Sequence, residues 1–183
     1  MEQLETRTVY QSPWMTVRED RVARSDGTTG TYGVVDKADF ALVIPSQPGG
    51  FWLVEQYRYP IGRRAWEFPQ GSWAGDPAGD QAALAMSELR EETGLAAGEL
   101  VHLGHLYGAY GFCSQGFDVF LATNLVVGEP RREHSERDMV HRFVTDGQLA
   151  TMVRTGEIVD GATIAAYALL AWFSRAALGT VVL

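Results

Sequence analysis

The chain has 183 residues and a formal charge of −8, with 15 lysines and arginines against 23 aspartates and glutamates. This is the length of one compact domain, and a hydrophobic share of 46% excludes wholesale disorder. The acidic balance excludes a general nucleic-acid binder, which needs a basic face. It does not exclude phosphate-bearing small molecules where a bound cation reverses the sign locally.

Cysteine content and hydrophobic runs bear on where the protein works. The only cysteine is Cys113, which excludes a disulfide within the chain and disfavours a thiolate-rich zinc site. The start, MEQLETRT, lacks the charged-then-apolar pattern of a signal peptide. The longest apolar run, around Ala162 to Phe173, is shorter than the ~20 residues of a membrane span. We therefore expect a cytoplasmic protein that does not enter a membrane.

Residues 1–38 are predicted to form a small antiparallel sheet, which we treat as a separate N-terminal region. Thr8 to Tyr10, Met15 to Asp20 and Thr31 to Val35 are β-prone, and Ser25-Asp26-Gly27 is a turn signal. The region has few apolar residues and makes a poor core on its own. We expect it to pack on the main domain or on a partner chain.

Residues 39–183 are predicted to form the main domain. An amphipathic helix is expected over Gln81 to Thr93, and residues 146–177 are expected to be helical, with Gly156 ending one helix and Asp160 capping the next. This order predicts an α/β (α+β) fold with helices packed on a central sheet. Strands are predicted at Phe40 to Ile44, Phe51 to Tyr57, Trp66 to Phe68, Leu103 to Tyr107, Phe117 to Leu125 and Met139 to Val144.

The helix at Gln81 to Thr93 has an acidic stripe beside an apolar one. Glu88, Glu91 and Glu92 lie at i, i+3 and i+4, so the helix can bury one face and direct three carboxylates to one place. Like charges at this spacing repel, and burial makes the repulsion worse. A divalent cation with oxygen ligands, Mg²⁺ or Mn²⁺, converts the repulsion into ligation and can hold a pyrophosphate. The alternative is a solvated acidic helix end. The apolar stripe consists of Ala82, Ala85, Met86 and Leu89.

This helix and its flanks resemble the Nudix box, the loop–helix–loop pattern G-x5-E-x7-R-E-U-x-E-E-x-G-U in which U is aliphatic. An extended Trp66-Glu67-Phe68-Pro69 leads into a glycine loop, the loop leads into the acidic helix, and a glycine ends that helix. The residues that match the pattern are Glu88, Leu89, Glu91, Glu92, Gly94 and Leu95.

Two departures make this a variant box. The loop from Gly71 to Glu88 is two residues longer than the pattern, so that Gly79 stands near the place of its first Glu. Ser87 replaces the Arg that, in the family, pairs with a box carboxylate and holds it in position. Arg90, in the same turn, compensates only in part.

Segments outside the box resemble the ADP-ribose pyrophosphatase branch of the Nudix family, over a stretch from about Trp14 to Leu170. The resemblance implies an α/β/α sandwich around a mixed sheet and an N-terminal sheet that forms a homodimer. It implies hydrolysis of ADP-ribose or a related nucleotide sugar by water attack at phosphorus, assisted by a metal ion. The matching segments are Val54 to Pro60, Trp66 to Gly71 and Gly156 to Ile164.

By this resemblance, the metal is Mg²⁺, with Mn²⁺ as a substitute, and four residues of the box region hold it. Glu88 and Glu92 are the principal ligands. Glu91 is a third ligand, or the base, or both in alternative states. Gln70 offers its backbone carbonyl to the metal.

A charged loop after the box, 131–138, is the second source of carboxylates. In this branch the catalytic base often comes from this region. Glu136 is expected to complete the metal site and Glu133 to activate the water. The alternative is a charged loop that is exposed to solvent.

Five residues are implied in substrate binding. Arg58 is expected to contact the phosphates or the terminal ribose, and Glu67 to contact ribose or orient the loop; the alternatives are a surface strand residue and a strand-edge carboxylate. Tyr110 and Phe112 are candidates to stack on a base or cover a sugar, or else belong to the core. Relatives often have Pro-Gly-Phe and then an acidic residue in this loop, where Tyr110 and Gln115 stand here.

These departures leave two other functions open. The same chemistry on GDP-mannose or a dinucleotide would fit the altered substrate loop. A nucleotide-binding module without turnover would fit Gly79 and Ser87, although it has little need for three box carboxylates. A histidine metal cluster is not expected, because His102 and His105 are three apart on a predicted strand and should point to opposite faces.

Overall fold

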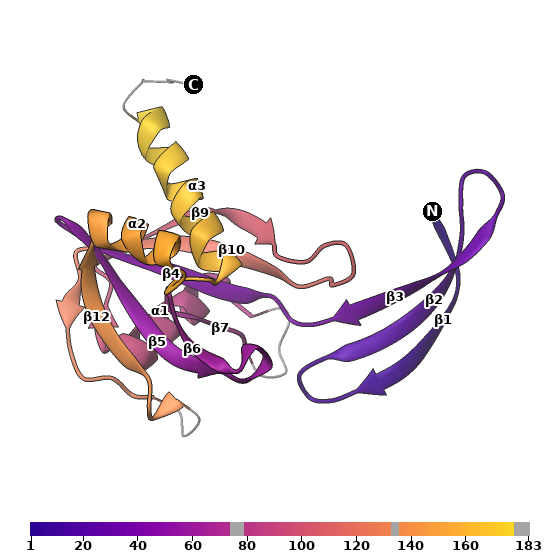
Figure 1. Ribbon diagram of the computed structural model, residues 1–183, viewed down its shortest axis with the longest axis horizontal. Helices are drawn as coiled ribbons and strands as arrows, with labels where there is room; N and C mark the ends of the chain where they lie inside the picture. The colour runs from indigo at the N-terminus through magenta and orange to yellow at the C-terminus, as the bar shows by residue number, and fades with distance from the viewer. Residues whose placement is uncertain (74–78, 133–135, 178–183) are drawn as a thin grey trace.

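The computed structural model describes residues 1–73, 79–132 and 136–177, the last three of them by backbone alone. Figure 1 shows two parts, a body in which a sheet lies between helices and an N-terminal sheet that projects from it. No helix in the described part of the chain combines the length and the apolar character needed to cross a membrane.

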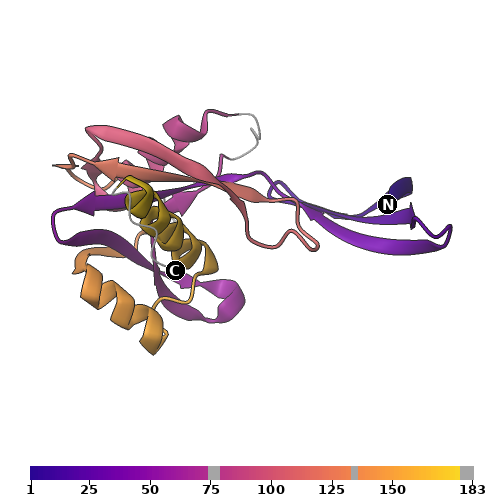
Figure 2. The ribbon, with the colours of Figure 1, turned by 90° about the horizontal axis from the view of Figure 1, so that it is seen from above.

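The N-terminal sheet is antiparallel, as predicted, and nearly all of it is exposed. Among its residues only Asp20 and Val22 are buried. Figure 2 shows that the sheet extends away from the body instead of folding back onto it. The sheet has the order β1-β2-β3 and consists of β1 (Glu2–Gln11), β2 (Thr16–Ala23) and β3 (Thr29–Asp36).

The end of β3 is attached to a loop of the body, the segment 108–115. Val35 N–H donates to Phe112 O at 2.8 Å, and Ser114 N–H donates to Val35 O at 2.9 Å. The hydroxyl of Tyr32 donates to Gly111 O at 2.6 Å. The position of this loop therefore depends on the N-terminal sheet.

The body contains a mixed sheet and a two-stranded ribbon. Their strands are β4 (Phe40–Gln47), β5 (Gly50–Arg58), β6 (Arg63–Glu67), β7 (Gln70–Gly71), β8 (Leu95–Ala96), β9 (Glu99–Tyr107), β10 (Gly116–Thr123), β11 (Val126–Val127) and β12 (Val140–Thr145). The mixed sheet has the order β12-β5-β4-β10-β9, with β6 on β5 and β7 on β4. β4 and β10 run parallel, whereas the other pairs are antiparallel. The ribbon is formed by β8 and β11.

Helices cover both faces of the mixed sheet. They are α1 (Gln81–Thr93), α2 (Asp146–Thr155) and α3 (Gly161–Ala177), and the short η1 (Tyr59–Ile61) lies between β5 and β6. Leu42 and Ile44 of β4 belong to the core under α2 and α3, whereas the alternate residues Ala41 and Val43 pack with α1. Figure 2 shows α1 on one side of the sheet and α2 and α3 on the other. The predicted α/β/α sandwich is confirmed.

The helix ends follow the sequence signals. α1 has the predicted bounds, with the Asp80 carboxylate accepting N–H groups of its first turn and Gly94 ending it at φ 77°. Gly156, at φ 76°, ends α2. Asp160 caps α3, because its Oδ2 accepts the N–H of Thr163 at 2.8 Å. These caps fix where the acidic stripe of α1 begins and ends.

The prediction that His102 and His105 point to opposite faces is wrong. The pairing of β9 with β10 skips Leu103, which forms a bulge and reverses the alternation of side chains. His102 Nε2 lies 2.7 Å from Asp118 Oδ1, and His105 Nδ1 lies 3.2 Å from Asp118 Oδ2. Both rings therefore contact the same carboxylate.

Two glycines that end helices form a matched pair for a stability test. A Cβ on Gly94 would lie 2.4 Å from the backbone oxygen of Gly128, whereas a Cβ on Gly156 would meet nothing within 4 Å. Gly156→Ala should therefore lower the free energy of unfolding by only about 1–2 kcal/mol, the cost of a left-handed backbone conformation in a residue that has a Cβ. Gly94→Ala should lower the free energy of unfolding at least twice as much, as measured by urea unfolding. An equal loss of stability in the two variants would contradict the close approach of Gly94 to Gly128.

Candidate active site

Glu92 is buried at the centre of the candidate site. Its Oε2 accepts the N–H of Gln70 at 3.2 Å, and its Oε1 has no hydrogen-bond partner among the described residues. Burial raises the pKa of Glu92 well above that of an ordinary carboxyl, and the charges of Glu88, Glu136 and Glu67 raise it further. An unpartnered buried carboxylate oxygen among other carboxylates is the environment that a divalent cation would stabilise.

The other two carboxylates of the acidic stripe each have a defined neighbour. A Cβ on Gly71 would lie 2.3 Å from Glu88 Oε1, so the Glu88 side chain occupies the space that glycine leaves free. Ser87 Oγ donates to Glu91 Oε1 at 2.5 Å. The structure thus brings Glu88 and Glu92 against the β7 segment, where Gln70 also lies.

The described residues do not show a preformed metal centre. No group of three or more His, Cys, Asp or Glu side chains among them is arranged to hold a metal ion. The donor set nevertheless fits Mg²⁺ or Mn²⁺, because it consists of carboxylate oxygens and leaves one of them buried without a partner. The ligand roles of Gln70, Glu88, Glu91, Glu92 and Glu136 stay predictions.

Glu67 and Arg58 form an ion pair beside this cluster. Arg58 Nε donates to Glu67 Oε2 at 3.1 Å, Arg58 Nη2 also bonds Oε1, and Gln56 Nε2 donates to Oε1 at 2.8 Å. Burial raises the pKa of Glu67, and Arg58 offsets only part of that rise. The carboxylate of Glu67 therefore fixes the guanidinium of Arg58, which also interacts electrostatically with Glu92 and Asp160.

Asp160 has a second role, beyond the helix cap, that its sequence position did not indicate. Its Oδ2 accepts a hydrogen bond from Gln70 Nε2 at 3.1 Å. Three residues later, Thr163 Oγ1 accepts the N–H of Phe68 at 2.9 Å. These bonds tie the start of α3 to the segment that leads into β7, and so position Gln70.

Two adjoining cavities lie over these residues. The larger, of about 340 Å³, is lined by Arg58, Glu67, Gln70 and Asp160 among others. The smaller, of about 200 Å³, shares Phe40, Arg58 and Gln70 with it. Its remaining lining is Lys37, Gly71, Ser72 and Gln115. Lys37 is the only lysine of the chain and was not singled out from the sequence.

The predicted substrate loop lies partly outside these cavities. Gln115 lines the smaller one, and its Nε2 donates to Ala38 O at 2.6 Å. Tyr110 and Phe112 are exposed and do not belong to the described lining of either cavity. Their binding role stays a prediction.

The charged loop after the box is anchored to the end of α1. Arg131 N–H donates to Glu91 O at 2.9 Å, and Arg132 Nε donates to Glu92 O at 3.1 Å. Arg132 Nη2 also lies 2.7 Å from Nδ1 of His141, whose pKa is lowered by burial and by Arg132. The two bonds to α1 were not predicted, because they join segments that are far apart in the sequence.

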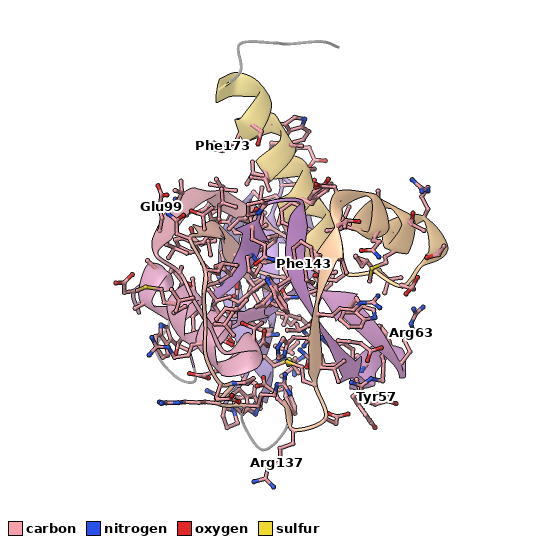
Figure 3. All side chains as sticks on the ribbon, turned by 90° about the vertical axis from the view of Figure 1, so that its left-hand side faces the viewer. Tyr57, Arg63, Glu99, Arg137, Phe143 and Phe173 are labelled. Atoms are coloured by element: carbon pink, nitrogen blue, oxygen red, sulfur yellow. The ribbon has the colours of Figure 1, made fainter. Side chains whose placement is uncertain are left out.

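The two carboxylates predicted in this loop differ in what the structure shows of them. Glu136 is close enough to Glu92 to raise its pKa. Glu133 lies outside the described residues, so its predicted role is not tested. Arg137 lies at the end of the body opposite Phe173 of α3 (Figure 3).

Comparisons with known proteins show the family to which the chain belongs. The chain is 36% identical over 167 residues to the ADP-ribose pyrophosphatase of Mycobacterium tuberculosis (strain ATCC 25618 / H37Rv), which covers 90% of this chain and 80% of that protein. The chain belongs to the ADP-ribose pyrophosphatase-like Nudix family. It is also 32% identical over 130 residues to the ADP-ribose pyrophosphatase of Bacillus subtilis (strain 168), over 70% of this chain and 68% of that one.

Two further matches cover the N-terminal region and the whole fold of this Nudix protein. Residues 1–35 match the family model described as the nucleoside diphosphate sugar hydrolase N-terminal domain. The fold matches a crystal structure described as that of an ADP compounds hydrolase, with a TM-score of 0.83. That match has 19% identity and covers 98% of this chain and 96% of the other.

The buried position of Glu92 predicts that its contribution to the stability of the protein falls as the pH rises. A carboxyl whose pKa is raised by folding contributes stability at acid pH that is lost as the pH rises through the folded pKa. With EDTA at neutral pH, Glu92→Gln should therefore raise the Tm by at least about 2 °C, the shift that 1 kcal/mol gives in a chain of this size. Thermal unfolding at neutral and acid pH measures this. An equal or lower Tm of the variant at neutral pH would show that the charge is already compensated.

Proposed function

We propose that this protein hydrolyses ADP-ribose or a related nucleotide sugar to a nucleoside monophosphate and a sugar phosphate. The proposal rests on Oε1 of Glu92, which is buried without a hydrogen-bond partner among the described residues. It belongs to a carboxylate cluster beside cavities lined by Arg58 and Lys37. The cluster can hold cations and the two basic residues can hold phosphates. The relatives described as ADP-ribose pyrophosphatases support the same substrate.

Mg²⁺, or Mn²⁺ in its place, would be held by the carboxylates of Glu88, Glu91, Glu92 and Glu136 with the carbonyl of Gln70. Such an ion would neutralise negative charge on the pyrophosphate and would make the attacking water easier to deprotonate. Arg58, fixed by its pair with Glu67, binds and orients the phosphates in the shared part of the cavities.

The remaining roles concern the water and the ends of the substrate. A carboxylate of the acidic loop, with Glu133 as the first candidate, takes the proton of the attacking water. Tyr110, Phe112 and Gln115 cover the base or the terminal sugar. With one cysteine, the chain has no intramolecular disulfide to form in an oxidising compartment, and we propose the cytoplasm as its location.

Product analysis tests the reaction. With Mg²⁺ or Mn²⁺, ADP-ribose should give AMP and ribose 5-phosphate, and EDTA should abolish the products. Glu92→Gln should lower kcat by at least about 100-fold, because it removes a charge that stabilises the transition state through the metal. Glu99→Gln is the matched control, since Glu99 is exposed on β9 at the periphery of the body (Figure 3), and it should keep full activity.

The alternatives give different results in the same assay. If only GDP-mannose or a dinucleotide is cleaved, the proposed mechanism stands but the substrate is not ADP-ribose. Nucleotide binding without products under either metal would indicate a binding module.

We also propose that the N-terminal sheet forms a homodimer. Hydrophobic side chains of this sheet are exposed, namely Leu4, Val9 and Tyr10 of β1, and so is Trp14 in the turn between β1 and β2. A three-stranded sheet that buries so little needs a cover to be stable. A second copy of the chain would supply that cover through residues 1–35, which match a separate N-terminal family domain.

The mass in solution tests the dimer. Light scattering should give twice the 20.1 kDa of one chain. Val9→Asp should shift the mass toward that of the monomer, because it places a charge in the covered face. Val127→Asp is the matched control, since Val127 is an exposed valine on a strand of the body. A monomeric wild-type protein would overturn the proposal.

A further inference from the structure

Ser87 occupies the helix position at which the box pattern has an arginine. It lies one turn before Glu91 on α1, at the i, i+4 spacing that brings two side chains together. A serine inside a helix commonly bonds the carbonyl four residues earlier. Here the hydroxyl instead donates to Glu91 Oε1 at 2.5 Å.

This bond restrains a flexible carboxylate. A hydroxyl that donates to an ionised carboxylate makes a short, charge-assisted hydrogen bond, and 2.5 Å lies at the short end of that range. Ser87 and Glu91 are both half-buried, so water competes with the bond less than it would on an exposed helix face. The bond therefore selects a narrow set of Glu91 side-chain conformations.

The bond differs from an arginine pair in its charge. A guanidinium would add a positive charge next to carboxylates that must bind a cation. A hydroxyl adds none, and the carboxylates of Glu88, Glu136 and Glu67 act on Glu92 strongly enough to raise its pKa. The serine thus leaves the charge of these carboxylates unopposed, while its bond holds Glu91, on the same helix α1, in place.

We propose that Ser87 is a positioning residue, whose hydroxyl orients the Glu91 carboxylate for a divalent cation without opposing the binding of that cation. The inference rests on the proposed function in that the cation is the one used in hydrolysis. It is specific to this chain, because it depends on the serine that replaces the arginine of the box.

Binding of Mn²⁺ to the full chain without substrate, measured by calorimetry, tests the proposal. Ser87→Ala should weaken Mn²⁺ binding about tenfold, the typical effect of removing a group that orients a metal ligand. Ser87→Thr keeps the hydroxyl and should bind as the wild type does. Because alanine is the better helix former, the Tm of Ser87→Ala with EDTA should be equal or higher. Ser174→Ala, at an exposed serine of α3, is the matched control and should leave Mn²⁺ binding unchanged.

The outcomes separate this inference from the proposed function. Unchanged Mn²⁺ binding in Ser87→Ala would overturn the positioning role, whatever the activity. The role would also be overturned if Ser87→Ala bound Mn²⁺ more weakly and had a lower Tm while Ser87→Thr failed to restore binding. That pattern would indicate a purely structural role. Weaker binding that Ser87→Thr restores, in a protein that hydrolyses none of the nucleotide sugars, would support the positioning role and reject the proposed hydrolysis.

Discussion

The burial of one carboxylate, that of Glu92, is the constraint on which the rest of the site depends. An ion-forming group inside a protein loses its hydration, and the loss is recovered only by partners of opposite charge or by hydrogen-bond donors. Here the chain supplies the N–H of Gln70 and leaves the second oxygen without a partner among the described residues. A fold that keeps such a group does so at a cost in stability, and a bound cation would offset that cost.

Much of the surrounding structure serves to hold α1 against β7. Asp80 caps the start of the helix, and Gly94 lets the backbone pass close to Gly128 at its end. Arg132 donates a hydrogen bond to the carbonyl of Glu92, in the last turn of α1. On the other side, Asp160 binds the side chain of Gln70, so α3 also contributes to the placement of β7. The carboxylates are thus supported by elements from both faces of the sheet.

Local patterns in the sequence predicted the parts of this protein that local forces determine. The bounds of α1, its acidic stripe, the end of α2 at Gly156 and the cap at Asp160 depend on residues within one or two turns, and the structure has each of them. The α/β/α layering was predicted from the resemblance of motifs, which carries information on distant contacts that spacing alone does not.

The features that were missed depend on how separate elements pair and pack together. The pair of Arg58 and Glu67 and the bond from Gln70 to Asp160 require the β5, β6, β7 and α3 segments to be in place first. The bulge at Leu103 arises from the pairing of β9 with β10, and it reverses an alternation that one strand considered alone would obey. β1 extends over Glu2–Gln11, well beyond the predicted Thr8 to Tyr10, because cross-strand pairing with β2 orders residues of weak β propensity.

Lys37 gives this molecule an unusual experimental handle. It is the only lysine in 183 residues, and it is exposed at the edge of the smaller cavity. Amine-directed chemistry would therefore modify one side chain besides the terminal amino group. A fluorophore attached there would stand beside Arg58 and Gln70 without any substitution in the sequence, and its emission would report on the filling and emptying of the cavity.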